Sequence, residues 1–118
     1  MKVRIKGNSL RYRLTKSEAA TLGSMGVLEE RSEFAGKTLV YAIVKTKDDT
    51  LSADYIADRI ELRMPEVMIN ELNNTDRVGF EDQTGPVSLL VEKDFTCLDN
   101  VEEDQSDNFP NPLRRDNT

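Results

Sequence analysis

Hydrophobic and basic residues alternate at the start of the chain, first over residues 2–6 and again over residues 10–14. A period of two residues predicts β-strands that bury one face and leave the other exposed. Between the two runs stands Gly7-Asn8, which indicates a turn, a bend or a bulge.

Two short helices are expected. The segment Thr15 to Glu18 fits a capping box, in which the Thr15 hydroxyl accepts from the Glu18 N–H and the Glu18 carboxylate accepts from the Thr15 N–H. We expect this helix to end at Gly23 or Gly26, because glycine adopts a left-handed conformation at little cost. The second helix is predicted to begin with Pro65 as its first residue, where the missing N–H would be unpaired anyway.

The other hydrophobic runs read as strands. The clearest is residues 38–45, whose centre, Leu39 to Val44, is almost entirely hydrophobic and rich in strand-forming residues. A hairpin is predicted about Ala57-Asp58. The remaining strands are expected at residues 27–34, 51–56, 59–64, 77–81 and 87–95.

The two halves of the chain share a pattern. The run from Leu10 through the first helix to Leu39 resembles the run from Ile60 through the second helix to Leu89. This indicates an internal repeat over about residues 1–50 and 51–98, although any α+β chain with two helices can be aligned in this way. The prediction is an α+β fold: a mainly antiparallel sheet or wide barrel made from two β-α-β-β repeats, with two short helices.

By topology alone, such units resemble the tunnel-barrel fold of the triphosphate-tunnel enzymes. Those enzymes carry an alternating glutamate motif near the N-terminus that binds metal. Here the corresponding positions, residues 2–6, read Lys-Val-Arg-Ile-Lys. The resemblance therefore implies a shape and no activity.

Length and composition narrow the function classes. A chain of 118 residues suits one domain, expected over residues 1–112, with an extended C-terminal tail and a disordered end at 113–118. A net charge of −6 argues against nucleic-acid and membrane partners. The chain has no histidine, which removes the commonest general base. The single cysteine, Cys97, is expected to be buried and structural, and the N-terminus does not read as a signal peptide, so we expect a cytoplasmic protein.

A row of cations is the first candidate site. Alternation places Arg11 and Arg13 on one face of a strand, and Arg63, at the position equivalent to Arg13 in the second half, is expected across from them. Guanidinium groups bind phosphate and carboxylate bidentately, so these three arginines are the predicted anion site. The alternative is a solvated strand face balanced by neighbouring glutamates. The same row also contains Lys2, Arg4 and Lys6.

The C-terminal segment offers two further candidates. Carboxylates such as Asp104 and Asp107 could hold a divalent metal ion, although the spacing is not that of an EF-hand and acidic tails are usually solvated. Phe109, Pro110 and Pro112 could dock as an extended segment, on this domain or on a partner. No cofactor is indicated.

The run from Val91 to Leu98, followed by Glu-Glu-Asp-Gln-Ser-Asp-Asn-Phe-Pro-Asn-Pro at 102–112, resembles the C-terminal signature of a small uncharacterised bacterial family. The opening residues 1–15 and Val27 to Glu30 resemble that family's N-terminus. The resemblance spans almost the whole chain. It implies a stand-alone domain of unknown function and supplies no activity, ligand or catalytic residue.

Three functional hypotheses remain open, and the sequence does not decide whether the protein is an enzyme. The first is a non-catalytic cytoplasmic binding or structural module that engages a protein partner. The second is a small-anion or nucleotide-binding protein, in one version a metal-dependent phosphohydrolase, that uses the arginine cluster. The third is a homodimer formed through an exposed strand edge.

Overall fold

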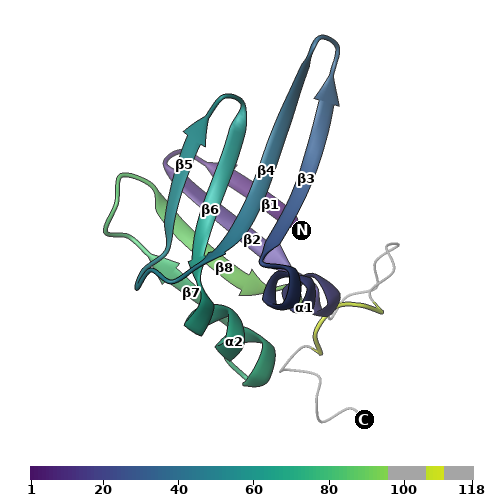
Figure 1. The fold of residues 1–118 in the computed structure, drawn as a ribbon, viewed down its shortest axis with the longest axis vertical. Helices are drawn as coiled ribbons and strands as arrows, with labels where there is room; N and C mark the ends of the chain where they lie inside the picture. Colours follow the sequence, from purple (N-terminus) through teal and green to yellow (C-terminus); the bar gives the residue numbers. More distant parts are fainter. Residues whose placement is uncertain (96–105, 111–118) are drawn as a thin grey trace.

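The computed structural model describes residues 1–95 and 106–110, and Figure 1 shows its strands and helices. The first half of the described chain consists of β1 (Lys2–Lys6), β2 (Ser9–Leu14), α1 (Lys16–Met25), β3 (Val27–Phe34) and β4 (Lys37–Thr46). The second half consists of β5 (Ser52–Ile56), β6 (Arg59–Pro65), α2 (Glu66–Asn74), β7 (Gly79–Asp82) and β8 (Ser88–Lys93). The α+β class and the two short helices are confirmed.

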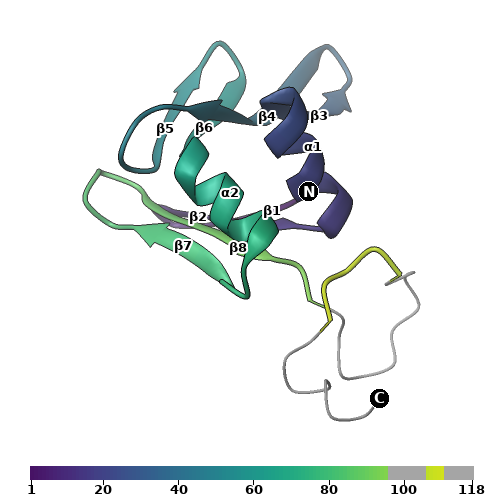
Figure 2. The same cartoon turned by 60° about the horizontal axis from the view of Figure 1, so that its bottom comes forward.

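The strands form two separate four-stranded sheets. Sheet A has the order β1-β2-β8-β7, and sheet B has the order β3-β4-β6-β5. Figure 2 shows the two sheets facing each other, with α1 and α2 lying toward one end of the space between them. The described strands pair mainly antiparallel, as predicted, but they form two sheets instead of one sheet or a wide barrel.

The division into two sheets follows from how the halves interlock. Each half is a hairpin, a helix and a second hairpin, so each repeat unit has one strand more than the predicted β-α-β-β unit. The helix carries the chain from one sheet to the other, so each sheet takes one hairpin from each half. The hairpins join through parallel pairs, β2 with β8 and β4 with β6, while the other pairings between these strands are antiparallel.

The core lies between the sheets and beneath the helices. Alternation places Tyr12 and Leu14 of β2 on the inner face of sheet A, and Leu62 and Met64 of β6 on the inner face of sheet B. The helices contribute Ala19, Leu22, Ile69 and Leu72, and the other buried hydrophobic residues include Ile43, Leu89 and Val91. No helix in the described ranges is both long enough and apolar enough to cross a membrane.

Local signals set the ends of the elements. The capping box at Thr15 and Glu18 is present, and α1 ends at Gly26, which has φ +80°. The sequence predicted Pro65 as the first residue of α2, and this is wrong by one position. Pro65 still pairs in β6 and stands at the N-cap of the helix. The predicted turn at Ala57-Asp58 joins β5 to β6, with both residues at positive φ.

Part of the C-terminal segment, residues 106–110, lies against the domain. The Phe109 N–H donates to the Asp94 carbonyl at 2.9 Å, and the Phe109 ring packs edge-on against Phe95 at 6.3 Å between centroids. Asp107 sits at the N-terminus of α1, where its carboxylate accepts from the Ser17 hydroxyl at 2.5 Å and from the Ser17 N–H at 3.3 Å. Residues 106–110 therefore make contacts both with the chain just after β8 and with the start of α1.

Candidate anion-binding face

Basic side chains cover the outer face of β1 and β2 in sheet A. The hairpin register sets Arg4 directly opposite Arg11, and Lys2 directly opposite Arg13. Tyr12 between the two arginines of β2 is fully buried, so the arginines must point outward. Like charges directly opposite each other in a sheet are destabilising, so this face concentrates positive charge at a cost in stability.

One carboxylate holds two of these arginines in place. Glu92 on β8 accepts from Nε of Arg11 at 2.7 Å and from Nε of Arg13 at 3.0 Å, both at the same oxygen, Oε1. The Glu92 side chain is only 16% exposed. Its partner on β7 is Gly79, where an added Cβ would lie 2.8 Å from the Glu92 Cβ. The hydrogen bonds to Glu92 hold the guanidiniums of Arg11 and Arg13 through Nε. Their terminal nitrogens have no partner among the described residues.

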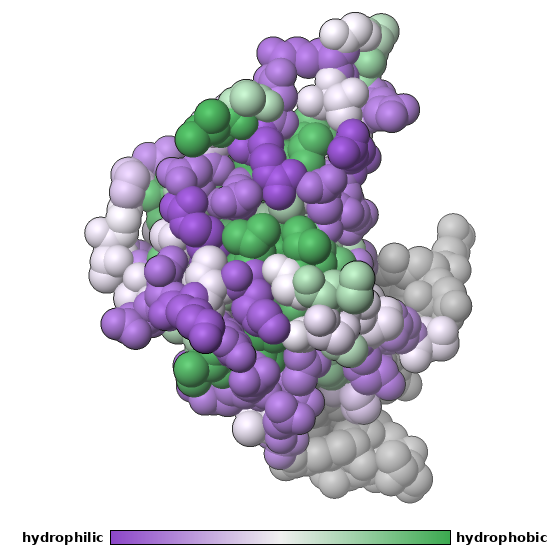
Figure 3. Space-filling model, in the orientation of Figure 1, coloured by the Kyte–Doolittle hydropathy of each residue, from purple (hydrophilic) through white to green (hydrophobic). Residues whose placement is uncertain are grey.

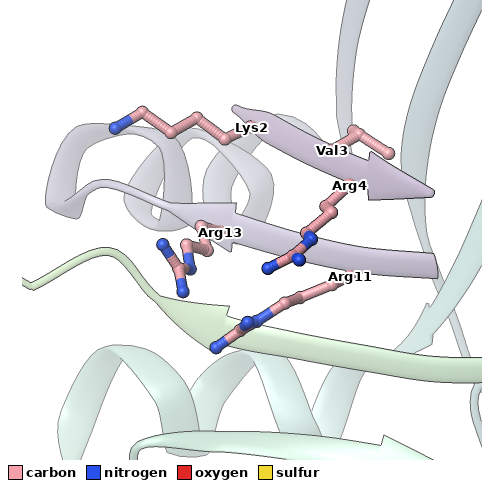
Figure 4. A pocket seen from close by; sticks show the side chains of 5 residues that line it. All are labelled: Lys2, Val3, Arg4, Arg11 and Arg13. Carbon is pink, nitrogen blue, oxygen red and sulfur yellow. The ribbon is translucent and has the colours of Figure 1, made fainter. Parts of the chain in front are cut away.

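Arg4 is the third guanidinium of the group. It is exposed and makes no hydrogen bond or ion pair with any residue in the described ranges. Figure 4 shows the guanidiniums of Arg4, Arg11 and Arg13 gathered on one side of the hairpin. Lys2 points away from them, and its Nζ lies 3.3 Å from Asp94 Oδ2.

These side chains line an open hollow of about 200 Å³, bounded by Lys2, Val3, Arg4, Arg11 and Arg13. The hollow has three guanidiniums, and Glu92 forms ion pairs with only Arg11 and Arg13, so the hollow is locally positive on a protein with a net charge of −6. The free N–H groups suit the oxygens of a phosphate or carboxylate, which guanidinium binds with paired hydrogen bonds. The hollow offers charge and hydrogen-bond donors, and it has the size of a single anionic group.

The structure does not bring Arg63 to this face. Arg63 lies on β6 in sheet B, where its Nε donates to Ser52 Oγ at 2.9 Å and its Nη1 donates to Asp54 Oδ2 at 2.6 Å. The bond to Asp54 contributes most to raising the pKa of Arg63. Equivalent residues of the two halves occupy opposite sheets, so Arg63 cannot join Arg13. Arg4 takes the third place, which the Gly7-Asn8 turn could have indicated because it sets Arg4 opposite Arg11.

The predicted metal site is not assembled in the described part of the chain. Asp104 lies outside the described residues, as do Cys97 and Pro112. Asp107 is bound to Ser17 at α1, and no group of three or more potential metal ligands occurs within residues 1–95 and 106–110. Phe109 lies against Phe95 of its own domain, with Lys93 Nζ 4.9 Å from the ring centroid, and Pro110 is exposed.

A second cavity opens between the two sheets. This cleft has a volume of about 400 Å³ and reaches the β1–β2 turn, at the end of β2 remote from α1. Its hydrophobic walls come from both sheets and include Ile5, Leu10, Leu39, Tyr55, Ile60 and Val87. Figure 3 shows that one face of the molecule carries separate hydrophobic patches among hydrophilic residues. Ile5 and Tyr55 at the cleft are both largely exposed.

Comparison with known proteins gives one match. The model of a family described as a family of unknown function (DUF7009) matches residues 1–113. No curated protein and no solved structure matches the chain. The resemblance to an uncharacterised domain family is confirmed, and the function has to be argued from the geometry.

Proposed function

We propose that the chain, which belongs to the family of unknown function DUF7009, is a non-catalytic binding module. In this proposal, the outer face of sheet A holds a phosphate or carboxylate group of the ligand. The observation that supports this most directly is the convergence of Arg4, Arg11 and Arg13 on one hollow. A cytoplasmic location stays a prediction from the sequence.

Glu92 gives this site its preorganisation. Because it orients Arg11 and Arg13 through Nε, the two side chains lose little further freedom when an anion binds. Arg4 has no carboxylate partner within the described residues, so an incoming anion would meet a guanidinium that need not first break an ion pair. The anion would also relieve the repulsion between Arg4 and Arg11.

Binding alone is proposed because Asp107, the candidate metal ligand among the described residues, is bound to Ser17 at the start of α1. A metal-dependent phosphohydrolase needs carboxylates beside the bound phosphate. Glu92 already accepts hydrogen bonds from two arginines, and Asp107 already accepts one from the Ser17 hydroxyl. A hollow of about 200 Å³ accommodates one anionic group of a ligand and is too small to enclose a nucleotide.

The test is calorimetric titration of the whole chain with inorganic phosphate and with citrate at low ionic strength. We expect Arg4→Gln to weaken binding by about tenfold, as the loss of one charge-assisted hydrogen bond implies. The matched control is Arg31→Gln on β3, which removes the same charge from an exposed edge strand of sheet B. Equal affinities for the unaltered chain and Arg4→Gln would refute the proposal.

A further inference from the structure

β1 is an edge strand, and no described strand pairs with its outer hydrogen-bonding edge. It lies at the end of sheet A, and β2 is its only strand partner in the described part of the chain. The two-residue turn makes Lys6 and Ser9 the first hydrogen-bonded pair of the hairpin. In an antiparallel ladder, hydrogen-bonded and non-hydrogen-bonded pairs alternate. The N–H and C=O groups of Val3 and Ile5 therefore point away from β2, in the plane of the sheet.

The two faces of β1 differ in chemistry. Lys2, Arg4 and Lys6 alternate on the outer face and are all exposed. On the inner face Val3 is half-buried, whereas Ile5 is 59% exposed although it lines the hydrophobic cleft. A strand added beside β1 would therefore meet positive charge on one side and hydrophobic surface on the other.

We propose that β1 is a docking edge for an extended acidic peptide in which carboxylate and hydrophobic side chains alternate. The peptide backbone pairs with Val3 and Ile5, as strands add to open sheet edges in other recognition systems. Its carboxylates lie beside the cationic row, with one of them in the hollow at Arg4. Its hydrophobic side chains contact Ile5 at the mouth of the cleft. This inference rests on the proposed function, because Arg4 belongs to both.

Charge selects this partner over a second copy of the chain. Pairing β1 with another β1 would place two rows of lysine and arginine side by side, and like charges across a sheet are destabilising. An acidic strand instead places opposite charges at the same positions. Charged side chains also protect sheet edges from self-association. The experiment must therefore distinguish a docking edge from an edge that is only protected.

The probe is an acetylated peptide of three Glu-Val repeats, added to the whole chain. We expect saturable binding and slowed amide exchange at Val3 and Ile5. Two control peptides are matched in composition: one with the three glutamates and three valines in separate blocks, and one with N-methyl groups on alternate residues. Both should bind at least tenfold more weakly, because the first lacks the alternation and the second lacks the backbone donors.

Variants of the protein separate the inference from the proposed function. Arg4→Gln should weaken the peptide about tenfold, and Arg31→Gln should leave it unchanged. Ile5→Pro removes an N–H that points away from β2, together with the exposed isoleucine side chain, and breaks no hydrogen bond of the β1–β2 hairpin. This variant should therefore lose the peptide and still bind inorganic phosphate.

The outcomes are distinct. If phosphate binds and depends on Arg4, but the peptide leaves exchange at Val3 and Ile5 unchanged, the docking edge is refuted and the anion site stands. Equal binding of the N-methylated peptide also refutes the docking edge. If neither phosphate nor the peptide depends on Arg4, both proposals fail.

Discussion

Lys45 and Lys93 make the same type of contact in the two halves of the molecule. Lys45 Nζ donates to the carbonyl of Gly23 at 3.0 Å, and Lys93 Nζ donates to the carbonyl of Thr75 at 2.8 Å. Each lysine comes from the last strand of its half and reaches the C-terminal end of that half's helix. Neither helix has a basic residue in its own last turn, so the strand supplies the charge that neutralises the helix end.

Replacing these lysines with methionine should destabilise the fold unequally. Methionine keeps much of the hydrophobic stem and removes the charged donor. Lys93 is 8% exposed, so Lys93→Met should lower the free energy of unfolding by about 2 kcal/mol, as expected for a buried charged hydrogen bond. Lys45 is more exposed, and Lys45→Met should cost about 1 kcal/mol. Urea denaturation measures both, and a Lys93→Met variant as stable as the unaltered chain would contradict this role.

Glu92→Gln should separate stability from anion affinity. The change leaves Arg11 and Arg13 without their shared carboxylate, so the free energy of unfolding should fall by about 1–2 kcal/mol. The hollow becomes more positive, and the affinity for inorganic phosphate should rise several-fold at low salt. Glu33→Gln on β3 is the control for net charge, since Glu33 is exposed in sheet B. Loss of phosphate binding in Glu92→Gln would show that orientation of the arginines matters more than charge.

Tyr12→Phe should not destabilise the protein. The Tyr12 hydroxyl is buried without a hydrogen-bond partner within the described residues, and such a group costs about 1–3 kcal/mol. We expect the variant to be at least as stable as the unaltered chain at neutral pH, and about 1 kcal/mol more stable if the vacated space closes. Thermal denaturation measures this, and a loss of 2 kcal/mol or more would show that the hydroxyl has a partner.

The same side chain predicts a response to alkaline pH. Burial raises the pKa of Tyr12 from 10.0 to about 12. The folded state favours the protonated phenol of Tyr12. The stability that this preference gives the folded protein is complete below the pKa of the unfolded chain and is lost as pH rises through the folded pKa. Stability measured between these two pH values should therefore fall more steeply for the unaltered chain than for Tyr12→Phe.

Docking of residues 106–110 should weaken in acid. The bond from the Ser17 hydroxyl is the main cause that lowers the pKa of the Asp107 carboxyl below its ordinary value of 3.8. Because this pKa is lowered, the Asp107 carboxylate stabilises the docked segment at pH values above the ordinary pKa. This stabilisation is lost as the pH falls through the lowered pKa. NMR shifts of Ser17 and Phe109 should report the release of this segment. Asp107→Asn should lose this transition. Asp82→Asn, which removes a carboxylate at the end of β7, should keep it.

Much of the local structure could be predicted because it depends on residues near each other in the chain. Alternation identified the strand at residues 10–14, and the capping box located the start of α1. Pro65 was placed one residue too far into the helix, because its pairing with Thr46 keeps it in β6. That pairing joins distant parts of the chain, and no local pattern contains it.

The candidate site was predicted in part for the same reason. Arg11 and Arg13 share a face through alternation alone, so their proximity follows from the sequence. Glu92, which holds them, comes from β8 through a parallel pairing between the two ends of the domain. Arg63 was expected with them because its half resembles the first, but the helix carries each half from one sheet into the other.

The sequence by itself determined the α+β class, the two helices, the turns at Gly7-Asn8 and Ala57-Asp58, and the buried face of β2, because short-range sterics, capping and periodicity set these features. Only the tertiary structure decided that there are two sheets, that Arg4 completes the arginine group and that Glu92 anchors it. Those features depend on which strands pair across many residues of chain, and burial of the shared core between the two halves selects that pairing.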